Sequence, residues 1–303
     1  MRNNQRQDNA SISRVTWIGL YSNLGLAAVK LSAGVWAGSL ALTADGLHSL
    51  ADTVTDLAVI FGVYFGGKEP DYTHPYGHGR IETFAAVFVA IALFLAGAGM
   101  MYKAGGDIAA IHAVPEKGPT TLNAAVIAVA LLSLGTKEVL YRWARRIAVT
   151  THSTALYANA WHHRSDSLSS VAVLIGVVAV RLGYPYGDPL AALAVSLMIV
   201  MVAIRIIGDC FHELSERAVD RSTLRQIEQV LGSDGRICQW HRLRTRTVGR
   251  EIFVDVHILV NPELNITEAH QIADTLENNL HHQIPRPINV VVHIEPDVPE
   301  LRQ

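Results

Sequence analysis

The hydrophobic pattern divides the chain into a long apolar part and a shorter mixed part. A helix needs about 20 mostly apolar residues to cross the hydrocarbon core of a bilayer. Stretches of that length lie in the first two thirds of the chain. Six of them are predicted to span the membrane: residues 14–36, 41–66, 83–105, 121–142, 156–181 and 189–207. The pattern therefore predicts a membrane α-helical bundle of six transmembrane helices.

Beyond residue 208 the pattern changes to short mixed elements. Apolar residues recur at helical spacing in two segments and alternate with polar residues in three others. In chain order these segments cover residues 222–232, 238–246, 250–260, 266–284 and 288–296. The order helix, strand, strand, helix, strand (αββαβ) predicts a small cytoplasmic α+β domain of the ferredoxin-like kind, with its helices on one face of a three-stranded sheet.

Composition and charge agree with a membrane protein whose N-terminus lies in the cytoplasm. The chain is 50% hydrophobic and 17% charged, whereas ordinary soluble domains carry about 25% charged residues. The polar start of the chain has no apolar signal-peptide core. Basic residues lie near the helix ends in alternate connections, which the positive-inside rule places in the cytoplasm: Arg2, Arg6, Arg14, Lys68, Arg80, Arg142, Arg145 and Arg146. We expect both termini in the cytoplasm and no nucleic-acid partner.

Two matched histidine–aspartate pairs stand out inside the apolar segments. His48 and Asp52 lie four residues apart in the second predicted span, as do His162 and Asp166 in the fifth. Residues four apart stack on one face of a helix. Together the pairs supply two nitrogens and two oxygens, a set that suits tetrahedral Zn²⁺. Ionisable groups inside a membrane usually mark an ion path, although a hydrogen-bonded contact between helices is the simpler explanation of either pair alone.

Other polar residues in the spans have less specific explanations. Asp56 lies one turn beyond Asp52 on the same face, where it suits a second-layer partner, a proton acceptor or a structural role. His163 points about 100° away from its neighbour His162 on the helix and is therefore a poor fourth ligand. Snorkelling to the interface or pairing between helices is expected of Lys30, Lys137 and Glu138.

A second candidate site lies in the cytoplasmic connection between the second and third spans. Asp71, His74 and His78 occupy a segment punctuated by proline and glycine. Two imidazoles and a carboxylate can converge there without the constraints of a helix, which would give a site with three ligands. A polar loop that happens to contain histidines is the alternative.

A third candidate site lies in the predicted cytoplasmic domain. Histidines and one acid fall on all three strands and on the second helix: His241, His257, His270, His293 and Glu295. A small domain of one sheet and two helices can gather these side chains on one surface. Each histidine taken alone is more simply an exposed residue.

Several motifs resemble those of the cation diffusion facilitator family of divalent-metal transporters. They are "ADGLHSLAD", "HPYGHGRIE", "NAWHHRSDSLSS" and the tail with "HRLRTR" and "VVVHIEPD", in the family's order. The resemblance implies a homodimer in a membrane, here of the bacterial zinc/iron efflux type in an inner membrane. It also implies a transmembrane transport domain over 14–208 after a tail over 1–13, and a metal-binding dimerisation domain over 209–303. A charge interlock between Arg80 and Glu216 is similar to a pair in the family.

The resemblance implies a secondary active transporter rather than an enzyme, one that exports a divalent cation from the cytoplasm in exchange for protons. Its transport site would be His48, Asp52, His162 and Asp166. Nitrogen ligands favour Zn²⁺ over harder ions; Cd²⁺, Fe²⁺, Co²⁺ and Mn²⁺ are alternative substrates. Two other functions are alternatives. One is a membrane metalloenzyme, although no HExxH motif is present. The other is a metal-sensing membrane scaffold of a specialised organelle, with little transport of its own.

Overall fold

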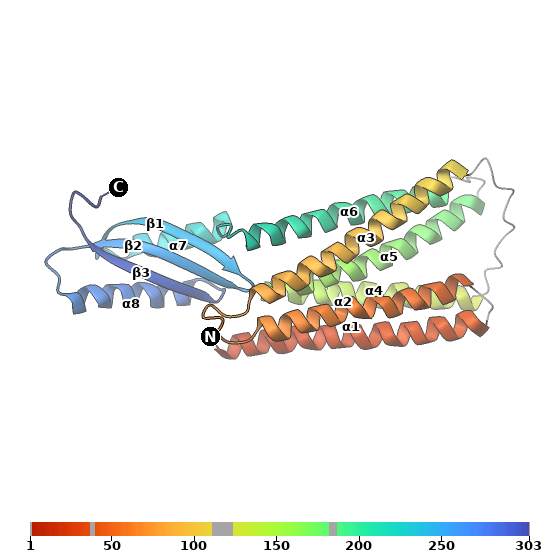
Figure 1. Ribbon diagram of the computed structural model, residues 1–303, viewed down its shortest axis with the longest axis horizontal. Helices are drawn as coiled ribbons and strands as arrows, with labels where there is room; N and C mark the ends of the chain where they lie inside the picture. Colours follow the sequence, from red (N-terminus) through yellow and green to blue (C-terminus); the bar gives the residue numbers. More distant parts are fainter. Residues whose placement is uncertain (1, 37–39, 111–123, 182–186, 303) are drawn as a thin grey trace. The chain divides into compact units, whose positions relative to one another are not determined.

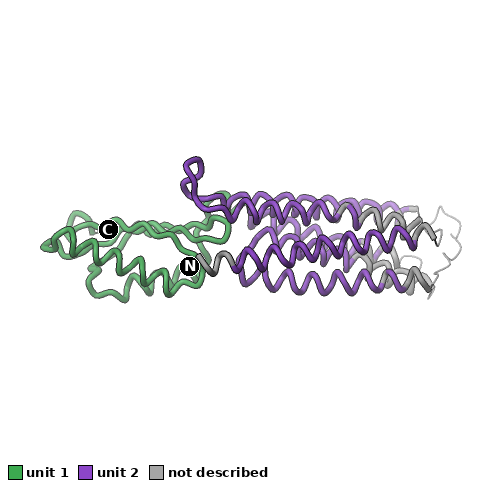
Figure 2. Tube along the Cα trace, turned by 90° about the horizontal axis from the view of Figure 1, so that it is seen from below, with its two compact units in different colours: residues 1, 211–303 green, residues 2–210 purple. Residues whose placement is uncertain are grey.

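The computed structural model describes residues 2–36, 40–110, 124–181 and 187–302. The chain separates into two compact units, which Figure 2 shows in different colours. The first unit covers Arg2–Cys210, and the second runs from Phe211 to the end of the chain. Each unit has its own cluster of buried hydrophobic residues.

Six long helices account for the described residues of the first unit, the last of them extending past its end to Leu214, and they run side by side in both views (Figures 1 and 2). Their bounds are α1 Arg2–Trp36, α2 Leu40–Gly66, α3 Arg80–Ala110, α4 Ala124–Thr151, α5 Thr154–Arg181 and α6 Gly187–Leu214. Each apolar stretch identified in the sequence therefore falls in its own helix, except that residues 121–123 of the fourth stretch lie outside the described residues. Helix α1 begins at Arg2, before the predicted membrane span that starts at residue 14, and Ile12 in this N-terminal part is fully buried in the hydrophobic core. Residues 2–13, expected to form a tail, continue this helix.

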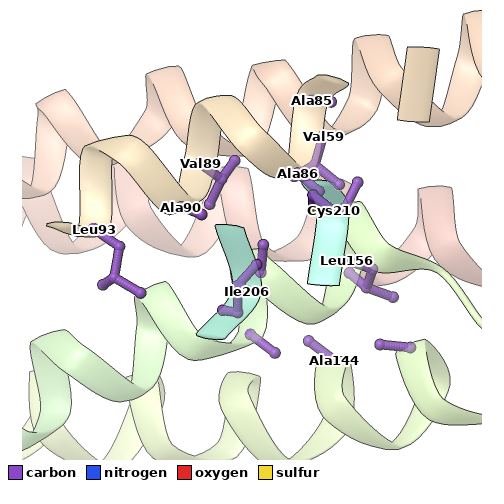
Figure 3. Close-up of a cluster of buried hydrophobic side chains, with 14 of the residues drawn as sticks. Val59, Ala85, Ala86, Val89, Ala90, Leu93, Ala144, Leu156, Ile206 and Cys210 are labelled. Atoms are coloured by element: carbon purple, nitrogen blue, oxygen red, sulfur yellow. The ribbon is translucent and has the colours of Figure 1, made fainter. Parts of the chain in front are cut away.

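Small side chains let the helices of the first unit approach closely. Figure 3 shows alanines from α3, among them Ala85, Ala86 and Ala90, packed with Val59 of α2 and Ile206 of α6. The contact between α2 and α3 leaves no room for a larger residue, since a Cβ atom built on Gly62 would lie 2.4 Å from Ala85 Cβ. Close approach of backbones through small residues is typical of helix packing in membranes.

The outer surface of this bundle is apolar, while charged groups lie inside it. Large hydrophobic side chains are exposed on several helices, such as Tyr21 (65%), Phe61 (56%) and Leu95 (63%). Asp52 and Lys137, in contrast, are 3% and 2% exposed. Within the described residues, two helical segments are long and apolar enough by themselves to cross a membrane, Arg80–Gly106 and Leu193–Leu214. A surface of this kind suits lipid rather than water.

The second unit has the order of elements that the sequence predicts. Helix α7 (Arg221–Ser233) is followed by strands β1 (Ile237–Val248) and β2 (Glu251–Val260), helix α8 (Ile266–Gln283) and strand β3 (Ile288–Pro296). The sheet order is β1-β2-β3. Strand β1 pairs antiparallel with β2, and β2 pairs parallel with β3 across the α8 crossover.

Both helices of the second unit cover the same face of its sheet. Alternate residues of β2, beginning with Ile252 and ending with Val260, are buried with Ile227 of α7 and Leu276 of α8. Because successive side chains of a strand point to opposite faces, His257 lies on the face that these helices do not cover. The strand pattern thus places a histidine on the open face of the sheet.

Side-chain caps fix where the two helices of this unit begin. The Asp220 carboxylate accepts hydrogen bonds from the backbone N–H groups of Ser222 and Thr223 at the start of α7. Its hydrogen bonds with Ser222 and Thr223 hold the Asp220 pKa well below the usual value. Asn265 and Glu268 form a capping box at the start of α8. These caps place the helices at defined positions along the sheet.

Candidate metal sites

The first cluster lies inside the helical bundle and combines residues from α2 and α5. Ligand atoms of Asp52, His162 and Asp166 all lie within 4.8 Å of one another. His162 Nε2 is 3.2 Å from Asp52 Oδ1. The side chains of Asp52 and His162 are 3% and 7% exposed, and that of Asp166 is 13% exposed. Two carboxylates and an imidazole that meet in a dry interior form a donor set able to hold a divalent cation.

His48, the fourth residue expected at this cluster, lies in helix α2, but its side chain is outside the described part of the structure. Three of the four expected transport residues are therefore brought together, and the position of the fourth side chain stays a prediction. Its spacing of four residues from Asp52 places both on one face of α2.

A lysine that the sequence did not assign to this cluster lies at its centre. Lys137 of α4 places its Nζ atom 2.7 Å from Asp52 Oδ2 and 2.7 Å from Asp166 Oδ2. Of the two roles expected for this residue, pairing between helices is therefore correct, and snorkelling to the interface is wrong. The next residue, Glu138, pairs with Arg142 on the same helix and with Arg164 on α5.

Two neutral amides and a histidine contact Asp56, which lies one turn along α2 from Asp52. Asn23 Nδ2 donates to Asp56 Oδ2 at 2.6 Å, and Asn159 Nδ2 donates to Asp56 Oδ1 at 2.8 Å. His163 Nε2 lies 3.7 Å from the same Oδ1 atom. Helix α1 also borders this group, since a Cβ built on Gly19 would lie 3.4 Å from His163 Nε2, an ordinary van der Waals contact. Both Asp56 and His163 belong to this second buried group. No pattern in the sequence links Asn23 or Asn159 to this group.

The loop between α2 and α3 forms the second cluster. Ligand atoms of Asp71, His74 and His78 lie within 4.8 Å of one another, and the two imidazole rings are 4.3 Å apart. His78 Nε2 is 3.4 Å from Asp71 Oδ2. The Asp71 carboxylate is organised by the Thr73 hydroxyl at 2.7 Å and by the His74 backbone N–H at 2.7 Å. These hydrogen bonds, with that of Thr73 the strongest, lower the Asp71 pKa to about 2. The carboxylate is therefore ionised at neutral pH.

Glycine at position 77 helps to close this loop. Gly77 has φ of +79°, a value that residues with a side chain adopt with strain. Its backbone N–H donates to the His74 carbonyl at 2.9 Å. The turn therefore places His74 and His78 on the same side of the loop, where Asp71 contacts both.

The third cluster lies on the open face of the sheet in the second unit. His241, His257 and His293 are direct neighbours across the three strands. Glu295 contacts all three imidazoles: Oε2 is 2.9 Å from His241 Nε2, and Oε1 is 2.9 Å from His257 Nδ1 and 3.4 Å from His293 Nε2. The hydrogen bond with His257 is the largest effect that lowers the Glu295 pKa.

The structure divides the five residues expected at this third cluster. His241, His257 and Glu295 offer ligand atoms within 4.8 Å of one another. His293 joins them through its contact with Glu295 and remains 62% exposed. His270, in contrast, lies on α8 with its Nε2 atom 3.6 Å from Asp274 Oδ1, and its side chain is 69% exposed. It is not among the residues brought within ligating distance in the described part of the unit.

The expected charge interlock concerns residues of both units, so it stays a prediction. Within the second unit, Glu216 pairs with Arg246, whose Nη1 atom lies 3.2 Å from Glu216 Oε2. Arg80 begins helix α3 in the first unit.

The bundle consists of apolar helices that enclose carboxylates and an imidazole, and a domain with a histidine cluster follows it. This combination defines a class of protein, membrane proteins that bind metal ions. Comparison with known proteins agrees. The family model described as "Cation efflux transmembrane domain" matches residues 16–215, and that described as "Cation efflux protein, cytoplasmic domain" matches residues 219–297. The chain therefore belongs to the cation efflux family, the cation diffusion facilitators.

Three relatives show how widely this family extends. The chain is 32% identical to the magnetosome protein MamB of Magnetospira sp. (strain QH-2) over 93% of its own length and 94% of that protein. It is 33% identical to metal tolerance protein C1 of Arabidopsis thaliana, over 92% of the chain and 61% of the relative. It is 29% identical to the manganese efflux system protein MneP of Bacillus subtilis, over 95% and 98%. The chain is accordingly a multi-pass integral membrane transporter of metal cations.

Proposed function

We propose that this protein exports Zn²⁺ from the cytoplasm in exchange for protons, with the transported ion held by Asp52, His162, Asp166 and His48. The observation that carries the proposal is the convergence of two carboxylates and an imidazole from α2 and α5 within 4.8 Å inside an apolar bundle. Placing ionisable groups there is costly, so their presence indicates an ion path. The proposed arrangement has six spans and both termini in the cytoplasm.

The donor set supports Zn²⁺ as the preferred substrate. Imidazole nitrogen suits Zn²⁺, whereas sites made of carboxylates and water suit Mn²⁺ or Mg²⁺. His162 supplies one nitrogen among the described ligands, and His48 would supply a second. The name of the relative MneP refers to manganese efflux, which makes Mn²⁺ the first alternative to compare.

Proton exchange follows from the chemistry of the same ligands. A metal binds an imidazole nitrogen that carries no proton, so loading of Zn²⁺ from the cytoplasm releases protons from the site. On the opposite side of the membrane, protons compete with the ion for the ligands and favour its release. His162 Nε2, the atom 3.2 Å from Asp52, is the nitrogen that we assign to the ion.

The second unit is proposed to dimerise and to sense metal rather than to transport it. Its cluster lies on the sheet face that α7 and α8 leave uncovered, where a ligand from solution can reach it. An ion bound there favours whichever arrangement of two subunits holds it more tightly. The loop cluster is proposed as a further binding site beside the cytoplasmic ends of α2 and α3.

Transport into proteoliposomes tests the proposal. Zn²⁺ uptake driven by a pH gradient should be abolished by Asp52→Asn and by Asp166→Asn, because each replaces an anionic ligand of a site that must strip water from a dication. The matched control is Asp255→Asn, which removes a carboxylate from an exposed position of β2 and should transport as the unchanged protein does. Normal uptake in both membrane variants would refute the assignment of the transport site.

A metal-sensing scaffold is the second candidate function, supported by the similarity to a protein named for the magnetosome. In this case the second unit binds metal while the bundle assembles partners. Counterflow in sealed vesicles separates the two candidates. A transporter exchanges labelled Zn²⁺ against unlabelled Zn²⁺ across the membrane, whereas a scaffold shows binding without exchange.

A further inference from the structure

We propose that the Lys137 ammonium acts as an internal counter-cation of the transport site. It pairs with the two carboxylates when no metal ion is bound, and an incoming metal ion displaces it. This inference rests on the transport function proposed above. It assigns to α4, a helix that carries none of the proposed ligands, a direct part in setting the affinity for the substrate. It also explains why a lysine is buried at the centre of the bundle.

The contacts of Lys137 are those of a bound cation rather than of a side chain that reaches for the membrane surface. Nζ lies 2.7 Å from one oxygen of each carboxylate, Asp52 Oδ2 and Asp166 Oδ2. The Lys137 side chain is 3% exposed, so water contributes little to the solvation of its charge. The positive charge of an ammonium shared between two carboxylates is compensated by their negative charges, and the ammonium in turn compensates the charges of the carboxylates.

The ion and the ammonium need the same oxygen atoms. A Zn²⁺ ion binds carboxylate oxygen at about 2.0–2.2 Å. With Nζ 2.7 Å from Asp52 Oδ2 and from Asp166 Oδ2, an ion bound to either oxygen would lie no more than about 5 Å from Nζ. The other oxygen of Asp52 is already 3.2 Å from His162 Nε2. Two positive centres this close in a dry site repel each other strongly.

Charge balance favours displacement over shared occupancy. Two carboxylates compensate one dication, and a retained ammonium would leave an excess positive charge in the interior. The four-carbon stem of lysine is flexible, so the ammonium can withdraw when an ion arrives. Asp56, one turn from Asp52 along α2, gives a withdrawn ammonium another carboxylate to turn to.

The same contacts predict how the empty carrier behaves. Without an ion, Asp52 and Asp166 would be two buried like charges, which is costly unless a cation compensates them. Lys137 supplies that charge within the protein, so that the metal-free bundle can change conformation and return for the next ion. The lysine therefore weakens binding of the substrate and speeds turnover.

Zn²⁺ binding to the purified full-length protein tests this inference. The measurement uses a background in which the loop and sheet clusters are removed by His74→Ala, His78→Ala, His257→Ala and Glu295→Ala, so that the membrane site is observed alone. In that background, Lys137→Met should lower the Kd for Zn²⁺ at least tenfold, which is about 1.4 kcal/mol. Lys137→Gln should change the Kd in the same direction. Lys103→Met, which removes an exposed charge from α3, is the matched control and should leave the Kd unchanged.

Transport kinetics distinguish displacement of the Lys137 ammonium by Zn²⁺ from a purely structural role of Lys137. In proteoliposomes made with otherwise unchanged protein, Lys137→Met should lower both KM and Vmax for Zn²⁺, because the ion binds more tightly and the empty carrier returns more slowly. Thermal unfolding gives an independent check. The variants should melt at lower temperature than the unchanged protein without metal, and saturating Zn²⁺ should remove that difference. A residue needed only for packing would leave the difference in place.

Asp166→Asn in the same background distinguishes a failure of the proposed transport site from a failure of the counter-cation inference alone. Binding that survives Asp166→Asn would refute the proposed transport site and this inference with it. Binding that is lost in Asp166→Asn but unchanged or weakened in Lys137→Met and Lys137→Gln would leave the transport site standing. It would refute the internal counter-cation alone.

Discussion

Zn²⁺ should stabilise the second unit through Glu295, and a single substitution should remove that effect. The perturbation is Glu295→Gln, which keeps the shape of the side chain and removes its charge from contact with His241, His257 and His293. The variant is made in a fragment of residues 211–303, which has its own hydrophobic core and its own helix caps. We expect the fragment to fold by itself for that reason.

The size of the effect follows from linkage. A ligand present at a hundred times its Kd stabilises the folded state by about 2.7 kcal/mol, which raises the melting temperature of a domain of this size by about 10–20 °C. Glu295→Gln should abolish most of this rise. Without metal the substitution should cost no more than about 1 kcal/mol, because partly exposed ion pairs contribute little.

The pH of the experiment matters because hydrogen bonding to His257 lowers the Glu295 pKa. A carboxylate whose pKa is lower in the folded state stabilises the fold above its unfolded pKa, and that contribution is lost as the pH falls through the folded pKa. The contribution of Glu295 is therefore fully present at pH 7. Differential scanning calorimetry at this pH, with and without Zn²⁺, measures both effects.

His270 provides the matched control, since it lies on α8 and pairs with Asp274 instead of Glu295. His270→Ala should keep the full rise in melting temperature. Two results would contradict the reasoning: a Glu295→Gln fragment that responds to Zn²⁺ as the unchanged fragment does, or a His270→Ala fragment that no longer responds. In the full-length protein, Glu295→Gln should slow transport without abolishing it, because the membrane site remains intact.

Three further predictions concern other parts of the molecule. At the loop cluster, Asp71→Ala should weaken Zn²⁺ binding at pH 7 and at pH 5 alike, because the Asp71 pKa is about 2 and its carboxylate is ionised at both values; equal binding by Asp71→Ala would show that this carboxylate is no ligand. In the bundle, Asp56→Ala should lower the melting temperature in thermal unfolding, because it removes the acceptor of the amide donors of Asn23 and Asn159 and each buried donor left unpaired costs about 1–3 kcal/mol. An unchanged melting temperature would contradict this reasoning. In the second unit, Asp220→Ala should lower the free energy of unfolding by about 1 kcal/mol at pH 7, because it removes the cap of α7. The Asp220 pKa is lowered in the fold, so this loss should vanish as the pH falls below the usual aspartate range. Urea unfolding of the fragment at several pH values measures the loss, and a loss that persists in acid would contradict the prediction.

The order of elements could be predicted from the sequence because the hydrophobic period differs between the two parts. A long apolar stretch predicted each helix of the bundle, and alternation of apolar and polar residues predicted the strands on either side of Gly249. Helix α1 extends beyond the predicted span into residues 2–13, which are polar apart from a few positions. Ile12 is buried by tertiary packing, which a local pattern does not contain.

The side-chain clusters of candidate ligands could be predicted where their residues share one helix or strand, and less well where packing brings different elements together. The spacing of His162 and Asp166 places them on one face of a helix by geometry alone. Lys137 was not assigned to that cluster, since a single lysine in an apolar stretch does not say which helix it faces. Likewise, nothing in the sequence separates His270, which pairs with Asp274, from His257, which contacts Glu295.

The central claim is that a metal ion binds between α2 and α5 inside the bundle, and X-ray absorption at the zinc edge tests it most directly. The sample is full-length protein without the loop and sheet ligands, loaded with one equivalent of Zn²⁺. The account predicts one bound ion per chain with only nitrogen and oxygen ligands at about 2.0–2.2 Å. It also predicts that the ion is lost when Asp52→Asn and Asp166→Asn are combined. An ion that this double variant retains, or a sulfur ligand at about 2.3 Å, would contradict the claim.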